Sequence, residues 1–344
     1  MNGASTFKTV LKRGALVTAA NWPVVLIEFI ADTTFKGLLA VPVIGAAVLV
    51  AMLLGADIRG IVQGSLRHAV VTVAGALAAE PVALGAFVLA LALVLVGGSV
   101  LMFLVKGGVV DVLVAGSVAA GAIERPPLRL ASFQRAARFS LERFTGGCRR
   151  LFPAYLVLGL LLMLVYGVSG GLDGLALYAG YAALGHGAPL VGWTLLAIAS
   201  VVLLAAWIAV VNLIYLLAQI VIATDDGRPG LRRAFRTLLA FLRGDLRDVA
   251  AVFGVWAVLV VLATVASALA WSGVGLIAFV PVVGIAVVPL QLAALVVRGV
   301  LFDYLGLTAL SAYLALYRSY LQRVSGDGAA GPVPGLESPV GRTA

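Results

Sequence analysis

The stretch that decides the fold is residues 81–105, PVALGAFVLALALVLVGGSVLMFLV, which contains no charged side chain. About 20 apolar residues in a helix are enough to cross the hydrocarbon core of a bilayer. Other apolar runs occupy 155–168, 191–223, 249–271 and 274–297. Membrane-spanning strands are shorter and alternate polar with apolar residues. These runs therefore predict an all-α fold, a polytopic integral membrane helix bundle.

The composition of the whole chain is also that of a membrane protein. Of its 344 residues, 62% are hydrophobic and 11% are charged, and the mean hydropathy is +1.13. A soluble globule of this size needs more polar surface. The formal net charge of +9 is compatible with nucleic-acid binding. However, the basic residues lie in short segments without the interleaved aromatic residues that such binding uses. We expect the lipid bilayer as partner and no nucleic acid, and the sequence leaves protein partners open.

The distribution of lysine and arginine predicts an orientation. These residues gather before residue 21, at 106–150, at 228–247 and from 298 onward, whereas 170–191 and 272–275 contain none. Basic segments of membrane proteins stay in the cytoplasm. Both termini are therefore expected to be cytoplasmic, and the bias toward Ala, Gly, Val, Leu and Arg favours the plasma (inner) membrane of a bacterium.

The apolar runs and charges together predict about six transmembrane helices. The expected elements are a cytoplasmic amphipathic segment at 1–21; a membrane domain at 22–324 with crossings at about 37–55, 81–105, 150–169, 190–212, 248–271 and 276–298; surface helices at about 128–147 and 230–245; and a disordered tail at 325–344. The path of 22–56 is the hardest to place, because Glu28, Asp32 and Lys36 interrupt its apolar residues. We interpret 22–35 as an interfacial or re-entrant piece; two crossings there would put the N-terminus outside, which its cations disfavour.

One internal repeat concerns the surface helices. SFQRAARFSLERFTGGCRR at 132–150 aligns without gaps with GLRRAFRTLLAFLRGDLRD at 230–248. In each copy, phenylalanine and leucine take one helical face and arginine the other, as in helices that lie in a membrane interface. A docking site for a partner protein is the rival interpretation. The candidate contacts to anionic headgroups are Arg135, Arg138, Arg143, Arg232, Arg233 and Arg236.

A second repeat supplies a candidate polar cluster. KGGVVDVL at 106–113 matches RGVLFDYL at 298–305, with a cation, a glycine and an aspartate at the same spacing. Asn212 falls at the corresponding point of a middle copy, so Asp111, Asn212 and Asp303 are predicted to be equivalent. Polar groups near membrane depth are candidates for function. They either lie separately in the headgroup layer or converge at a cytoplasmic mouth to bind a cation or a lipid amine.

The sequence predicts no catalytic set, no cofactor and no metal site. His68 and His186 have no cysteine or carboxylate at ligand spacing, and no serine lies in a nucleophile elbow. The sequence also lacks the glycine-rich, lysine-containing motif of phosphate-binding loops. The sequence therefore favours a protein that is not an enzyme.

A family resemblance rests on the basic start, on Asn21-Trp22-Pro23, and on spans separated by surface helices of the form LRRAFRTLLAFLRGDLRD. In these features the chain resembles bacterial multi-spanning families similar to the membrane domain of glycerophosphoryl diester phosphodiesterase. The resemblance implies a membrane module and carries over no catalytic residue. We expect a non-enzymatic membrane module or lipid-organising or assembly protein. The alternative is a transporter or channel for a small solute, ion or lipid, which should show a cavity lined by Asp111, Asn212 or Asp303.

Overall fold

The computed structural model describes residues 3–54, 80–125, 127, 129–184, 190–225, 231–278 and 281–328. Throughout these ranges the protein is an all-α helix bundle without strands. Its helices are α1 (Gly3–Ala20), α2 (Trp22–Leu54), α5 (Pro81–Ala119), α6 (Leu130–Ala136), α7 (Leu141–Leu184), α8 (Leu190–Thr224), α9 (Leu231–Ala278) and α10 (Pro281–Gly328). The predicted fold class is thus confirmed.

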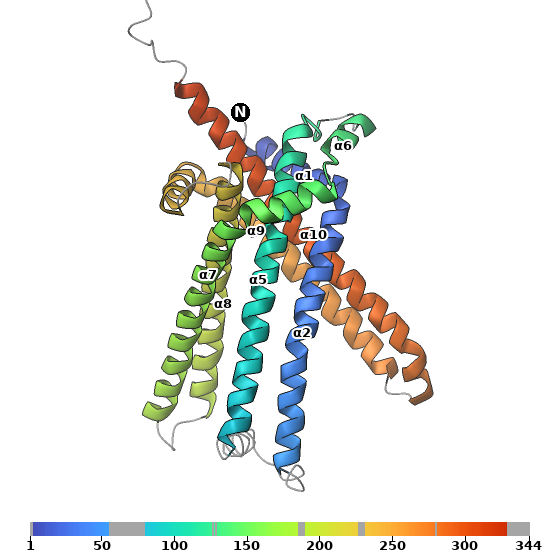
Figure 1. Ribbon diagram of the computed structural model, residues 1–344, viewed down its shortest axis with the longest axis vertical. Helices are drawn as coiled ribbons and strands as arrows, with labels where there is room; N and C mark the ends of the chain where they lie inside the picture. Colours follow the sequence, from blue (N-terminus) through green and yellow to red (C-terminus); the bar gives the residue numbers. More distant parts are fainter. Residues whose placement is uncertain are drawn as a thin grey trace, which may run out of the picture.

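Six long helices pair in chain order into the hairpins α2–α5, α7–α8 and α9–α10 (Figure 1). Each helix of a hairpin contacts the other, and α5 also contacts α7, α8 contacts α9, and α10 contacts α2. Five of the six, all except α2, contain described segments that are long and apolar enough to cross a membrane. The protein is therefore a multi-pass membrane protein.

The packing differs between the two ends of the bundle. The buried residues gather at the end that carries α1 and α6, which we call the packed end. At the other, open end the hairpins spread apart (Figure 1), and the most apolar stretch of α8 has no buried residue. In one helix, Leu217 is 1% exposed and Leu203 is 70% exposed.

The N-terminal helix α1 belongs to the packed end and is held by specific contacts. A Cβ atom on Gly14 would stand 2.8 Å from backbone atoms of α10, so glycine allows the two helices to touch. The buried Thr18 Oγ1 donates to the Leu307 carbonyl at 3.2 Å. Arg13 donates to the Ser117 and Gly121 carbonyls at the end of α5, where unpaired carbonyls favour a cation. The predicted amphipathic segment 1–21 is thus a packed helix over its described part.

Helix α2 differs from its sequence prediction because one of its acidic residues has an ion-pair partner on α5. The interfacial or re-entrant piece expected at 22–35 is not a separate element, since α2 runs without interruption from Trp22 to Leu54. Glu28 pairs with Lys106 of α5, and Asp32 pairs with Lys36 one helical turn away. Paired charges tolerate burial far better than isolated ones, so α2 does not need to end before them.

The two segments predicted as surface helices differ in their backbone. In α9 the backbone leaves helical geometry at Asp245 (φ −128°, ψ 27°), which agrees with a surface helix ending near 245. The helix expected at 128–147 is instead divided into α6 and the start of α7, separated by 137–140. The Ser140 Oγ accepts from the Arg143 N–H at 3.2 Å, and this N-cap begins a new helix. That helix, α7, continues through Pro153 into the crossing.

The C-terminal helix is longer than expected. α10 ends at Gly328, so residues 325–328 are helical and the disordered tail predicted from 325 does not start there. The rest of that predicted tail, 329–344, lies outside the described residues.

Candidate functional site

A cavity of about 720 Å³ lies between α2, α9 and α10 and is the best candidate site. We call it the α2–α10 cavity. Its walls combine apolar residues with two carboxylates and two cations. The lining residues are Phe29, Asp32, Thr33, Lys36, Thr264, Leu292, Leu295, Val296, Arg298, Gly299, Phe302 and Asp303.

The α2 side of this cavity has paired charges. Glu28, which is 5% exposed, forms an ion pair with Lys106 through Oε1. Its second oxygen, Oε2, is buried and has no hydrogen-bonding partner among the described residues. Asp32 and Lys36 pair with each other across one helical turn and face the cavity. The α2 side chains that line the cavity are therefore electrically balanced, and the unsatisfied oxygen of Glu28 lies outside the lining.

The α10 side has charges without such pairing. The ion pairs of the described residues include neither Arg298 nor Asp303. The Arg298 guanidinium carbon lies 5.7 Å from the centre of the Phe302 ring, a cation–π contact. The Asp303 Oδ2 atom is buried without a hydrogen-bonding partner in the described part of the chain. A buried, unsatisfied carboxylate oxygen is costly, so the α10 wall is incomplete as it stands.

An apolar cleft between the two helices of the last hairpin adjoins the cavity. This α9–α10 cleft has a volume of about 280 Å³ and is lined on the α9 side by Ala263, Ala266, Ser267 and Ala270. Leu295, Arg298 and Phe302 line both the cleft and the α2–α10 cavity. The charged groups and a strip of small side chains therefore line two neighbouring hollows.

Asp111, the first member of the predicted cluster, lies in a different place. Its carboxylate accepts from Arg150 of α7 at 2.5 Å. A Cβ atom on Gly147 of α7 would stand 2.6 Å from the Asp111 Cβ, so glycine is needed for the two helices to approach here. Together with Glu142 and Arg143 these residues line a polar hollow of about 590 Å³. The charges that line this hollow are therefore two carboxylates and two arginines.

The other two members of the predicted cluster, Asn212 and Asp303, lie in different surroundings. Asn212 is exposed on α8 and accepts a hydrogen bond from the Tyr166 hydroxyl of α7 at 2.5 Å. Asp303 faces the α2–α10 cavity. No hydrogen bond or ion pair between described residues joins Asp111, Asn212 and Asp303 to one another. The structure thus gives each a different neighbour, and equivalence in sequence does not bring them together.

The six candidate headgroup arginines are all exposed at the packed end. In the first part of α9 the opposite face is buried through Ala234, Leu238 and Phe241, which is the amphipathic pattern expected of a surface helix. Arg233 lies 4.0 Å from Asp225, an exposed pair with little energetic weight. The exposed arginines are Arg135, Arg138, Arg143, Arg232, Arg233 and Arg236.

Asn21 is a structural residue that the sequence analysis missed. It is fully buried between α1 and α2. Its side-chain nitrogen donates to the Val17 and Ala136 carbonyls, both at 2.9 Å, and its Oδ1 accepts from the Arg138 N–H at 2.8 Å. The amide therefore fixes the position of α6 against the N-terminal helices. A polar residue directly before Trp22-Pro23 was the available signal.

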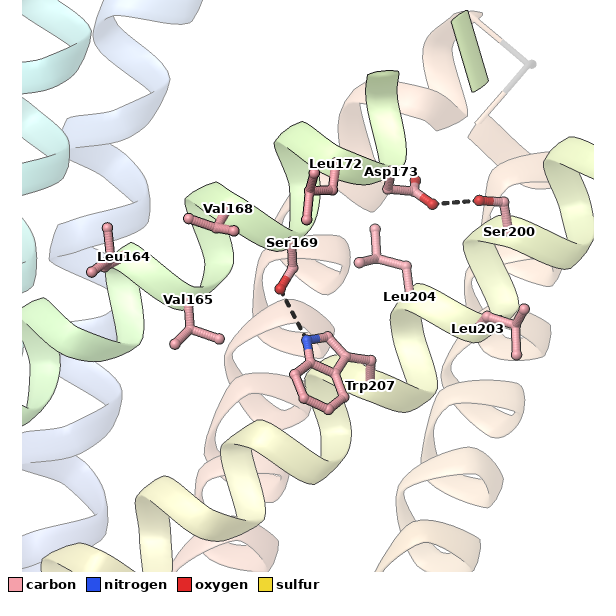
Figure 2. A pocket seen from close by; sticks show the side chains of 10 residues that line it. All are labelled: Leu164, Val165, Val168, Ser169, Leu172, Asp173, Ser200, Leu203, Leu204 and Trp207. Atoms are coloured by element: carbon pink, nitrogen blue, oxygen red, sulfur yellow. Dashed lines mark hydrogen bonds between the residues drawn. The ribbon is translucent and has the colours of Figure 1, made fainter. Parts of the chain in front are cut away.

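A further cleft of about 750 Å³ lies toward the open end, between α7 and α8 (Figure 2). Its walls are mostly leucine and valine. Figure 2 shows the Trp207 indole donating to the Ser169 hydroxyl at 2.9 Å, and the Ser200 hydroxyl donating to Asp173. These bonds tie the two helices together while the aliphatic side chains around them stay uncovered.

Comparison with known proteins gives no relative: no family model, no curated protein and no solved structure matches the chain. Within the described ranges, no three side chains of His, Cys, Asp or Glu are grouped to hold a metal ion. His68 and His186 lie outside the described side chains. The function must therefore be argued from the geometry alone.

Proposed function

We propose that this protein is a non-enzymatic membrane module that binds and organises phospholipids, with its packed end at the cytoplasmic face of a bacterial plasma membrane. The observation that carries the proposal is the contrast within the spans. Their packed end forms a core, whereas their open end exposes apolar side chains on helices of separate hairpins. Lipid acyl chains solvate such surfaces in a bilayer. The clefts between the helices are binding sites for individual acyl chains in this proposal.

The packed end supports the same proposal through its charges. Exposed arginines on α6, α7 and α9 would lie at the level of the headgroups, where each basic residue near an anionic surface contributes about 1 kcal/mol of attraction. Each hairpin also follows a helix or segment at the packed end, namely α1, α6 with the start of α7, and the start of α9. This order favours an internal repeat and agrees with the resemblance to membrane modules.

The lipid-binding proposal is tested by neutralising one surface helix. Arg232→Gln, Arg233→Gln and Arg236→Gln together should lower retention of anionic phospholipid about a hundredfold, because roughly 3 kcal/mol of attraction is removed. Native mass spectrometry of protein released from nanodiscs counts the retained lipids. Changing Lys8, which is exposed on α1, to Gln is the single-charge control. Equal anionic-lipid retention by the wild type and the triple variant would contradict this role for α9.

The orientation is tested separately with a cysteine label. Cys148 is the single cysteine of the chain and is buried. In a Cys148→Ser background, Glu142→Cys should react with a membrane-impermeant maleimide only after the cytoplasmic face is opened, because Glu142 is exposed at the packed end. Labelling in intact cells at the rate of a known external cysteine would place the packed end outside and reject the proposed orientation.

A transporter is the second candidate, favoured by the charged α2–α10 cavity. A transporter must open that cavity alternately to both sides, and solute flux into proteoliposomes would show it. Flux abolished by Asp303→Asn would favour transport over a purely organising role.

A further inference from the structure

The α2–α10 cavity and the α9–α10 cleft together have the shape and charge of a lipid site. We infer that they bind one phospholipid with a primary-amine headgroup, the ammonium at Asp303, the phosphate at Arg298, and an acyl chain in the cleft. This inference rests on the proposed lipid-binding function and names the lipid class. It uses two adjoining hollows that share Leu295, Arg298 and Phe302.

The charges of the cavity select a zwitterion. Asp32 and Lys36 neutralise each other, which leaves one cation, Arg298, and one carboxylate, Asp303, without an ion-pair partner among the described residues. A guanidinium is well suited to bind a phosphate. A primary ammonium supplies three N–H donors, and the buried Asp303 Oδ2 lacks one. An ethanolamine headgroup therefore complements these two side chains in the sign of its charges and in its hydrogen-bond donors.

Both charges line the same cavity from one helix. Arg298 and Asp303 lie on the same helix, about 7.5 Å apart along its axis at the usual rise per residue. The guanidinium lies over the Phe302 ring between them. A second unsatisfied carboxylate oxygen, Oε2 of the buried Glu28, lies on α2.

Other common headgroups fit less well. A phosphatidylglycerol headgroup would satisfy Arg298 but would leave Asp303 without a cation. A choline headgroup carries a positive charge but no N–H group, so it cannot donate to Oδ2. The cavity therefore distinguishes ethanolamine from choline by hydrogen bonding and from glycerol by charge.

The test compares lipids with identical acyl chains in nanodiscs, read by native mass spectrometry. Wild-type protein should retain one phosphatidylethanolamine in about tenfold preference over phosphatidylcholine, the effect expected of one charge-assisted hydrogen bond. Asp303→Asn should remove most of that preference. The matched control is Asp225→Asn, the same change at an exposed pair with Arg233, and it should keep the wild-type preference.

Several outcomes would overturn the inference. Equal retention of ethanolamine and choline lipids by the wild type would overturn the inference. This comparison needs no variant, so it is valid even if Asp303→Asn does not fold. Arg298→Gln provides a second variant, and an unchanged preference in both variants places the lipid elsewhere. Displacement of the lipid by equimolar phosphoethanolamine would show a water-soluble ligand and reject the acyl-chain part. Retained lipid without headgroup preference rejects only this inference, whereas no retained lipid of any kind also rejects the proposed function.

Discussion

The packed end and the open end of α8 are both apolar in sequence but differ in what covers their side chains. In α8, residues 217–223 are all buried, whereas Leu203, four turns earlier, is exposed. Lipid tails are as apolar as leucine, so hydrophobicity alone does not pack helices in a membrane. The packed end uses close approach at glycines and satisfied polar groups instead, as at Gly14, Gly147 and Asn21. The protein therefore concentrates its buried core at one end of its spans.

The largest expected effect comes from truncating one leucine at each end of α8. Leu217→Ala removes a side chain that is 1% exposed and should lower the free energy of unfolding by about 3 kcal/mol, through lost contacts and a cavity. Leu203→Ala, the identical change at a 70% exposed site, should change it by less than about 0.5 kcal/mol. Thermal or denaturant unfolding in the same detergent measures both. Equal losses would show that the open end is packed, for example by a second copy of the chain.

A smaller effect is expected from filling a helix contact in α7. A Cβ at Gly147 would collide with the Asp111 Cβ and come within 3.2 Å of the Gly107 carbonyl. Gly147→Val should therefore destabilise the protein by about 2 kcal/mol through overpacking. At Gly167, on the same helix, nothing lies within 4 Å of an added Cβ, so Gly167→Val should be nearly neutral. A neutral Gly147→Val in the unfolding measurement would mean that α5 and α7 are not held by this crossing.

The sequence predicts the features that depend on local pattern. Apolar runs indicate the all-α membrane bundle, and the arginine and leucine spacing at 230–245 indicates the surface part of α9 that ends at Asp245. Each rests on residues close together in the chain, where helical periodicity is sufficient.

The features that the sequence does not predict depend on partners far along the chain. The continuity of α2 depends on the Glu28–Lys106 pair, and the break between α6 and α7 on the bond from the Arg138 N–H to Asn21. For the same reason, Asp111 and Asp303 share a sequence spacing but have different neighbours. A repeat in sequence fixes a position on a helix, whereas the site is decided by which other helix faces that position.

The smallest effect tests whether polar groups specify the packed end, and it uses two asparagines. Asn21→Ala leaves the Ala136 carbonyl and the Arg138 N–H without their partner, which should cost about 1.5 kcal/mol because both groups lie against a buried site. Asn212→Ala removes an exposed acceptor of the Tyr166 hydroxyl, and Tyr166 can turn toward another acceptor, so the change should be close to neutral. The decisive measurement is amide hydrogen exchange of 130–140 in detergent. Faster exchange there in Asn21→Ala alone would show that this amide holds α6 in place, whereas unchanged exchange would mean that packing around Ala136 is sufficient and that the hydrogen bonds of Asn21 are secondary.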